Sequence, residues 1–295
     1  MPSLKEIKGR IGSVKSTLKI TSAMKLVASA KLRKAQNAIT ALRPYEAALV
    51  SILSRLGETG ETVFTAKREE KRVVIIAMAS NSSLCGGFNA AAFRETLSAA
   101  DDFRAAGAES IEVISIGRKM ADSMKKAGFP STDDLHHLSE HPDYASAASL
   151  SETLMDRFEK CEIDRVEIVY NHFVSTASQK PVRETLLPVP NVISSGASSV
   201  ISSGGEAGVE KSVDYIIEPS PEEALGALLP KTLKLKLYAA LLDSSAAEHA
   251  ARTVAMQTAT DNAEDLLDDL TLEYNKGRQQ KITSELLDII GGTMK

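Results

Sequence analysis

The residues of this sequence that could carry out chemistry begin with one glycine-containing motif. Leu-Cys-Gly-Gly-Phe-Asn occupies 84–89, after an apolar run and before a helical pattern. A helix that starts there could bind phosphate at its N-terminus. The motif lacks both the G-x-G-x-x-G spacing and the lysine of a Walker loop, so we interpret it as a structural turn. A nucleotide site is the alternative.

Cysteine chemistry is the second possibility. Cys85 and Cys161 lie far apart and match no metal-ligand spacing. So few cysteines in 295 residues fit a reducing compartment such as the cytosol. We interpret Cys85 as a small packed hydrophobe, with a reactive thiol as the alternative.

Metal binding is the third possibility, because three histidines share the segment DDLHHLSEH at 133–141. Nothing in the pattern holds these side chains in one coordination geometry, so we interpret the segment as a solvated loop. The sequence therefore predicts no catalytic, cofactor or metal site. The three histidines are His136, His137 and His141.

The N-terminal segment is strongly basic. Residues 1–43 contain ten Lys and Arg against one Glu, a net charge of +9 in a chain whose total is −4. Nucleic-acid binding is the usual function of such a segment. The segment contains no aromatic residue for stacking and carries an unbroken apolar pattern, so we predict no nucleic-acid partner.

That apolar pattern predicts a long helix. Apolar or small residues recur at steps of three and four, as in a coiled-coil seam. Pro44 interrupts the pattern, which resumes and then ends near Gly57, so we predict one kinked helix over 1–57. The seam residues are Leu4, Ile7, Ile11, Val14, Leu18, Thr21, Met24, Ala28, Leu32, Ala35, Ile39, Leu42, Leu49, Leu53 and Leu56.

The middle of the chain, 70–218, alternates strand and helix patterns, which is typical of a small Rossmann-like α/β domain. A Ser/Gly-rich flexible loop is expected at 194–208. Strands are expected at 72–79, 111–116 and 165–173, with 182–189 pairing back and a possible last strand at 213–217. Helices are expected at 89–106, 118–126 and 144–160.

A second long helix is predicted over 220–290. Ser-Pro-Glu-Glu supplies Ser220 as N-cap and Glu223 for a capping box. About 70 helical residues would span roughly 100 Å, so the helix needs partners along its length. The fold class is therefore α/β, with the two terminal helices forming a long antiparallel coiled coil beside the central domain. The C-terminal helix should be about ten residues longer and leave its tip alone. Its alanine-rich part, 246–259, suits a thin shaft that other proteins enclose.

Composition excludes a membrane-spanning protein. The longest apolar run is 73–79, far short of the roughly 18 residues that a spanning helix needs. Aromatic residues make up only 4% of the chain and Trp is absent, which favours helices packed through aliphatic side chains.

Several blocks together resemble the gamma subunits of bacterial F-type ATP synthases. These are KEIKGRIGSVKSTLKITSAMKLVASAKLRKAQ at 5–36, LCGGFN at 84–89, VYNHF at 169–173 and RTVAMQTATDNAEDLLDDLTLEYNKGRQQKITSELLDIIGG at 252–292. The blocks span essentially the whole chain. One block departs from the family, because Asn81-Ser82-Ser83 stands where Asp-Arg-Gly is usual.

The resemblance implies a rotor without catalytic activity of its own. The coiled coil would lie inside the hexamer of alpha and beta subunits, and the α/β domain would stand with epsilon on the membrane ring of c subunits. The chain would be peripheral, at the cytoplasmic face of the cell inner membrane. Met24 and Lys25 would face the acidic lever of beta, and Arg278, Gln279 and Thr283 would meet the loop that grips the upper shaft.

Two other classes of function stay open on the residues alone. One is a small-molecule enzyme built on the α/β domain, with the helices as dimerisation arms. No nucleophile, base and orienting group occur at a recognisable spacing, which disfavours it. The other is a coiled-coil scaffold or nucleic-acid clamp.

Overall fold

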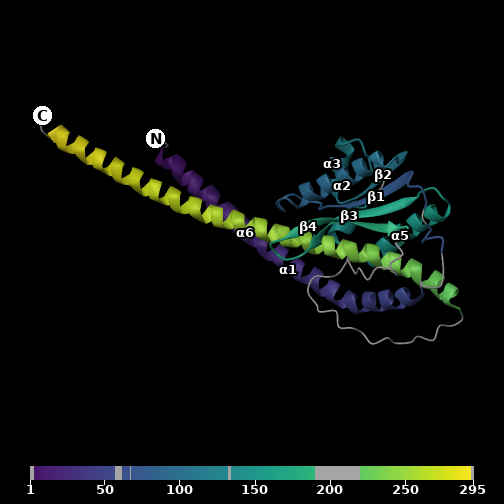
Figure 1. Cartoon of the computed structure of the whole chain (residues 1–295). Coiled ribbons are helices and arrows are strands. Elements are labelled where there is room, and N and C mark those ends of the chain that lie inside the picture. The colour runs from purple at the N-terminus through teal and green to yellow at the C-terminus, as the bar shows by residue number, and fades with distance from the viewer. Residues whose placement is uncertain (1–2, 57–61, 67, 132–133, 190–219, 294–295) are drawn as a thin grey trace. The chain divides into compact units, whose positions relative to one another are not determined.

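The computed structural model describes residues 3–56, 62–66, 68–131, 134–189 and 220–293. The chain divides into two compact units, one made of Met1–Ser29 with Arg252–Lys295 and the other of Ala30–Ala251. Two long helices, α1 (Leu4–Leu56) and α6 (Pro221–Thr293), contribute to both units (Figure 1). No described helix combines the length and the apolar character that crossing a bilayer requires.

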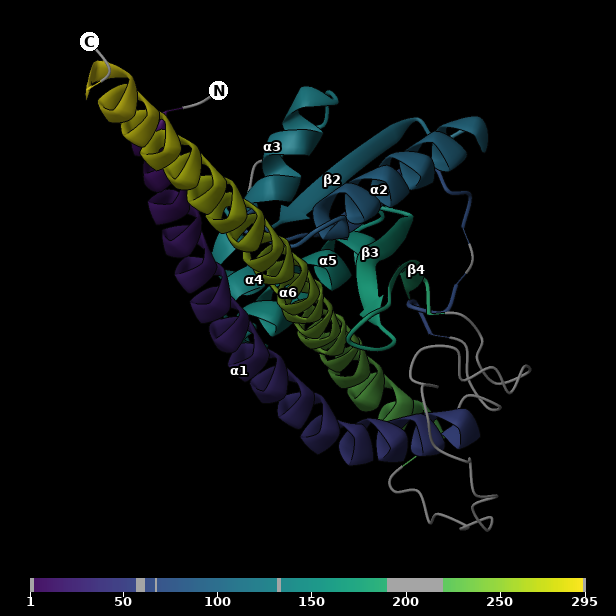
Figure 2. The same cartoon turned by 90° about the vertical axis from the view of Figure 1, so that its left-hand side faces the viewer.

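Helix α1 confirms the predicted seam. Every seam residue is buried or half-buried, and the basic residues from Lys5 to Arg43 are exposed except Lys25, which is half-buried. The helix continues through Pro44 to Leu56. It bends towards its C-terminal end (Figure 2), as expected where a proline removes an intrahelical hydrogen bond.

Helix α6 begins where the sequence predicted. The Ser220 hydroxyl accepts a hydrogen bond from the Glu223 backbone N–H at 3.2 Å, which caps the first turn. The predicted difference in helix length was wrong, because α6 has 73 residues and α1 has 53. Leu56 ends α1 just before Gly57, whereas α6 passes through Gly291 and Gly292.

The second unit contains a four-stranded sheet of order β2-β1-β3-β4. Strand β1 is parallel to β2 and β3, and β4 runs antiparallel to β3. The strands are β1 (Arg72–Met78), β2 (Ser110–Ile116), β3 (Arg165–Phe173) and β4 (Gln179–Leu187). The helices between them are α2 (Phe88–Ala105), α3 (Arg118–Lys126), α4 (His136–Glu140) and α5 (Tyr144–Glu159).

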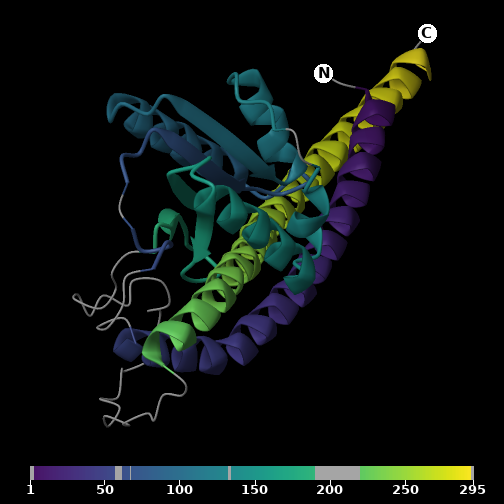
Figure 3. The ribbon, with the colours of Figure 1, turned by 90° about the vertical axis from the view of Figure 1, so that its right-hand side faces the viewer.

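Helices cover both faces of this sheet because its central strands are apolar on both sides. Along β1, Val73, Ile75 and Ala77 pack against α2 and α3. The alternate residues, Val74, Ile76 and Met78, pack against α5 and the first part of α6. Figure 3 shows the helices on the two sides of the sheet. The predicted Rossmann-like α/β domain is confirmed.

Two expectations need comment. The segment around the three histidines was predicted as a loop, but His136–Glu140 forms the short helix α4 with Leu138 fully buried. Burial of that leucine fixes the segment against the sheet. The predicted loop at 194–208 and strand at 213–217 lie outside the described residues.

Within the second unit, α6 contacts neighbours on two sides. Leucines at every fourth position from Leu225 to Leu241 join the core beneath the sheet. Beyond them, Ala246 and Ala250 pack with Leu32 and Ala35 of α1. Small side chains therefore let α1 approach here, and the expected thin shaft is partly enclosed by the chain's own domain.

The turn before α2 packs against α6 in the same way. Cys85 is 1% exposed and packs with Phe88, Ala247 and Ala251, so its interpretation as a small packed hydrophobe is confirmed. Gly86 adopts the left-handed φ of 58° that a tight turn requires. Gly87 has φ of −81°, a conformation that other residues also adopt, so the backbone does not require glycine there.

Asn81, at the position where the sequence departs from the family, joins three segments. Its Nδ2 donates to the His136 carbonyl at 2.8 Å. Its Oδ1 accepts from the Arg118 backbone N–H at 3.0 Å, at the start of α3. An uncharged amide thus serves as both donor and acceptor at a position where a carboxylate could only accept.

Gly117 provides a sharp test of this junction. A Cβ there would lie 2.0 Å from the Ala79 carbonyl oxygen, and the residue has φ of +100°. We expect Gly117→Ala to lower the free energy of unfolding in urea by at least ~3 kcal/mol. Gly128→Ala is the matched control, because Gly128 has φ of +91° with nothing within 4 Å of the added Cβ. It should cost only ~1–2 kcal/mol of backbone strain, and equal losses would contradict the clash.

An ion pair links β3 to α6. His172 Nδ1 lies 2.5 Å from Asp243 Oδ2, and Asp243 Oδ1 accepts from the Phe173 backbone N–H at 3.1 Å. This hydrogen bond to Asp243 raises the pKa of His172 above the ordinary 6.5, although partial burial opposes the rise. The histidine therefore favours its charged form in the folded chain.

The pH dependence of stability follows from that direction. A raised pKa in the folded state stabilises the fold fully below the unfolded pKa of about 6.5, and the gain is lost as pH rises through the folded value. Wild type should therefore lose this part of its unfolding free energy between mildly acidic and alkaline pH. His172→Gln and Asp243→Asn should each flatten the profile measured by urea unfolding across pH. An unchanged slope in both variants would contradict the assignment.

Candidate partner-binding surface of the terminal helices

In the first unit, the N-terminal part of α1 and the C-terminal part of α6 pair antiparallel. Three contacts set the register. Leu4 lies beside Gly277, where an added Cβ would be 3.2 Å from its Cδ2. Thr260 Oγ1 donates to Thr21 Oγ1 at 2.9 Å, and Lys25 Nζ donates to Gln257 Oε1 at 2.7 Å. Each advance along α1 is matched, to within one residue, by a step back along α6.

A narrow line of buried side chains holds this pair together. Its members are small or aliphatic, as expected for two helices in close contact. A two-helix pair buries only one stripe of each helix, so the remaining surface is free to meet other molecules. The small and aliphatic buried residues are Ile7, Thr21, Ala28, Met256, Thr260, Ala263 and Leu270, and Arg252 is buried as well.

Met24 and Lys25, expected from the resemblance to contact a partner, are half-buried. Lys25 holds Gln257, which in turn donates to Asp261 Oδ1 at 2.6 Å. Such an exposed hydrogen bond contributes only ~0.5–1.5 kcal/mol net. The ammonium group can therefore exchange Gln257 for a carboxylate outside the chain at low cost.

Arg278, Gln279 and Thr283, the other three expected residues, are exposed. The Thr283 hydroxyl donates to the Gln279 carbonyl at 3.0 Å, within the helix. No other described residue forms an ion pair with Arg278. Its guanidinium therefore keeps its fork of donors available for a partner carboxylate or carbonyl.

The structure places these five residues in two groups. Lys25 lies beside Gln257, and Arg278 is 21 residues further along α6. At 1.5 Å per residue, the two groups are roughly 30 Å apart along the helix. One partner residue cannot contact both, so the contacts that the resemblance implies would fall in two separate zones.

Sequence reasoning missed an apolar part of the first zone. Ile20, Leu26 and Val27 are 59%, 68% and 58% exposed on α1, around Met24 and Lys25. They lie outside the seam. Apolar residues at positions that the three-and-four pattern does not use could have indicated this exposed surface. Several exposed aliphatic residues within two turns of one helix are typical of a surface that contacts another molecule.

The end of α6 is unpaired, as the sequence predicts for the tip of the longer helix, and it is apolar. Ile282, Leu286 and Ile289 are 48%, 54% and 63% exposed. Leu4 pairs with Gly277, so no described α1 residue lies opposite this tip. The apolar tip therefore has no cover within the first unit.

Charge differs between the two helices. The basic residues of α1 face solvent, with Lys25 half-buried, whereas an acidic run on α6 is fully exposed. That run consists of Asp261, Glu264, Asp265, Asp268 and Asp269. Among the described residues, none of these acids forms an ion pair with an α1 lysine, so the surface presents distinct positive and negative faces.

Comparison with known proteins identifies the family. A family model described as ATP synthase matches residues 3–294. The ATP synthase gamma chain of Phocaeicola vulgatus is 51% identical over 297 residues and covers all of both chains. That of Heliobacterium modesticaldum is 38% identical, over 99% of this chain and 98% of its own.

The chain belongs to the ATP synthase gamma-chain family. Solved structures agree on the fold. A chain of the mitochondrial ATP synthase of Euglena gracilis matches with a TM-score of 0.61 and 20% identity, over 99% of this chain and 93% of that one. A chain from the central stalk and c-ring structure of Tetrahymena thermophila matches with a TM-score of 0.57 and 22% identity, over 81% and 99%.

The contact across the paired helices can be tested by removing one hydroxyl. Thr260 and Thr258 each bond the carbonyl four residues earlier, but only Thr260 also bonds across to α1. We expect Thr260→Val to lower the free energy of unfolding by ~1 kcal/mol more than Thr258→Val, followed by circular dichroism in urea. Equal effects would show that the bond to Thr21 does not stabilise this gamma-family helix pair.

Proposed function

We propose that this chain is the central rotor shaft of a proton-translocating F-type ATP synthase. It couples rotation of the membrane c-ring to conformational change in the catalytic beta subunits. The antiparallel α1–α6 pair, with unused polar and apolar surface around it, is the observation that carries this proposal. The relatives named ATP synthase gamma chain support it, as does the solved structure titled as a rotor.

The paired helices and the α/β domain contact different partners. The paired helices, within 1–57 and 220–290, lie inside the hexamer of alpha and beta subunits. The domain at 70–218 binds epsilon and stands on the c-ring. The chain is thereby held at the cytoplasmic face of the cell inner membrane, as a peripheral subunit.

The chain does not catalyse ATP synthesis itself. The turn at 84–89, which offered the nearest resemblance to a phosphate-binding loop, packs against α6 through Cys85 and Phe88. The polar side chain of Asn89 is also engaged, because its Oδ1 accepts from the Ser80 backbone N–H at 3.0 Å. Nucleotide chemistry therefore belongs to the beta subunits.

Asymmetry of the shaft determines which beta subunit changes. The helix pair has a positive face on α1, an acidic face on α6 and exposed aliphatic residues around Met24 and Lys25. Each of three surrounding beta subunits meets a different face, so each acquires a different affinity for nucleotide. Rotation exchanges those affinities in order.

Contacts that move must form and break at low cost. Exposed ion pairs contribute little individually and are screened by salt. Lys25 fits this requirement, because it can leave Gln257 for an acidic lever and return to it. Arg278 and Gln279 serve the second zone, where a loop of the hexamer grips the shaft through hydrogen bonds near the apolar tip.

The grip is tested in the assembled complex. We expect Arg278→Ala combined with Gln279→Ala to reduce ATP turnover by about tenfold or more, since each lost charge-assisted or neutral hydrogen bond contributes ~1–3 kcal/mol. ATP synthesis in membrane vesicles and subunit content of the purified complex are the measurements.

The matched control removes the same side-chain types from another face. Lys276→Ala combined with Gln280→Ala deletes one cation and one amide, and both residues are exposed. They are four residues apart on the side of the helix away from Arg278, whereas Gln279 is three residues from Lys276 and borders that side, so the comparison isolates Arg278. Normal turnover and assembly in the Arg278/Gln279 variant would refute the assigned grip, and equal losses in both variants would show that the face does not matter.

A further inference from the structure

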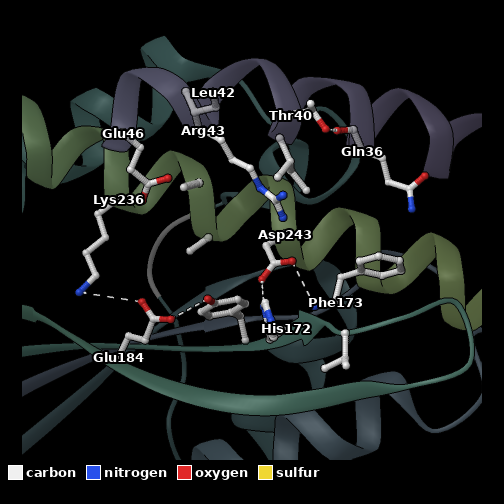
Figure 4. Close-up of a pocket in the computed structure, with 15 residues that line it drawn as sticks. Gln36, Thr40, Leu42, Arg43, Glu46, His172, Phe173, Glu184, Lys236 and Asp243 are labelled. Atoms are coloured by element: carbon white, nitrogen blue, oxygen red, sulfur yellow. Dashed lines mark hydrogen bonds and ion pairs between the residues drawn. The ribbon is translucent and has the colours of Figure 1, made fainter. Parts of the chain in front are cut away.

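The second unit contains a cavity of about 620 Å³ between α1, α6 and strands β3 and β4 (Figure 4). That volume is within the range of small-molecule sites. Part of its wall is apolar, formed by Ile39, Leu42, Phe173 and Ala239. The rest carries ionisable side chains from four different elements, so the cavity is not a purely apolar packing defect.

Glu184 of β4 forms one side of the cavity and is only partly satisfied. Its Oε1 accepts from the Tyr170 hydroxyl at 2.7 Å. Its Oε2 is buried and accepts no hydrogen bond from a described residue. The nearest cation is Lys236 Nζ at 3.9 Å, which donates instead to the Thr185 carbonyl at 2.7 Å. A buried carboxylate oxygen without a donor costs free energy.

Glu46 of α1 faces the same cavity from the opposite wall (Figure 4). It makes no hydrogen bond to another described residue. Burial, followed by the charge of Glu184, raises the pKa of Glu46 above 4.5. Burial likewise raises the pKa of Glu184. Among the described residues, Glu46 and the Oε2 atom of Glu184 thus lack a hydrogen-bond donor that would stabilise an ionised carboxylate.

Lys236 is a cation that acts on both carboxylates, but its Nζ donates to the Thr185 carbonyl and to neither of them. Asp243 is engaged by His172 and by the Phe173 backbone N–H. The Arg43 side chain extends from α1 towards Asp243, on the other side of the cavity from Lys236 (Figure 4). A ligand cation is therefore directed away from Arg43 and towards the space between Glu46 and Glu184.

We propose that this cavity binds a small organic cation, a protonated amine on a short carbon chain, between Glu184 and Glu46. The ammonium group donates to the two carboxylates, and the carbon chain packs against the apolar wall. The site goes beyond the rotor function, because it makes the chain a receptor for a small molecule. Its occupancy would stabilise the folded chain by mass action.

The test is calorimetric titration of the purified full-length chain with n-pentylamine. The amine is protonated at neutral pH, as a lysine side chain is, and n-pentanol is its neutral counterpart. We expect saturable binding of pentylamine, on the order of millimolar for so small a ligand, and at least about tenfold weaker binding of pentanol.

Two variants locate the site. Glu184→Gln keeps an acceptor for Tyr170 and should weaken pentylamine binding about tenfold, as should Glu46→Gln. Glu264→Gln, an exposed acid of the first unit, is the control and should bind as wild type does. If Glu184→Gln does not fold, Glu46→Gln alone decides. A ligand-dependent shift of the His172 imidazole resonance in wild type places the amine in the cavity.

Any one of three results would overturn the proposal. Pentylamine does not bind saturably, pentanol binds as tightly as pentylamine, or the folded Glu46→Gln variant binds pentylamine as wild type does. None of these outcomes bears on rotor activity of the assembled complex, so the two proposals fail independently.

Discussion

A helix of 73 residues carries more apolar side chain than it can leave in water, and the rest of the structure depends on how α6 covers it. Each part of the helix finds a different cover. From Leu225 to Leu241 it is the core beneath the sheet, and from Ala246 to Ala251 it is α1 on one side and the turn before α2 on another. From Met256 to Leu270 it is the N-terminal part of α1. Only the tip has no cover from a described residue of its own unit.

Local chemistry in the sequence was enough to predict most elements. The apolar run of β1 marks a strand buried on both faces, the Ser220 cap marks a helix start, and α3 has the predicted bounds, Arg118–Lys126. The errors arose where a pattern does not specify its partner. A repeat of three and four residues is the same whether it faces another helix or solvent, so the sequence predicted an unpaired tip but underestimated how much longer α6 is than α1. Leu138 similarly gave too short a signal to reveal α4.

The candidate sites differ in how much of each could be predicted from the sequence. Met24, Lys25, Arg278, Gln279 and Thr283 came from resemblance, since the spacing of single residues on a helix surface does not show which of them contact a partner. Proximity of Lys25 to Gln257 depends on the antiparallel register, which no local pattern contains. The cavity is further still from prediction, because its carboxylates belong to different elements and its unsatisfied oxygen is a property of packing. Sequence indicates acidic side chains, and only the fold shows which of them lack a donor.

The chain uses two classes of contact, buried aliphatic packing and exposed polar contacts, for different purposes. Burial of aliphatic side chains stabilises by ~1.5–3 kcal/mol for each large residue, which suits joints that must persist. The leucines of α6 and the alanines beside α1 are of this kind. Exposed polar contacts such as that of Lys25 are weaker and salt-sensitive, which suits surfaces that must release at each step of rotation. The tip of α6 is apolar, like the persistent joints, but its side chains are exposed, like the polar contacts, so they offer apolar surface to a partner. A shaft built this way is held together by its own core, while its grip on the surrounding subunits stays reversible.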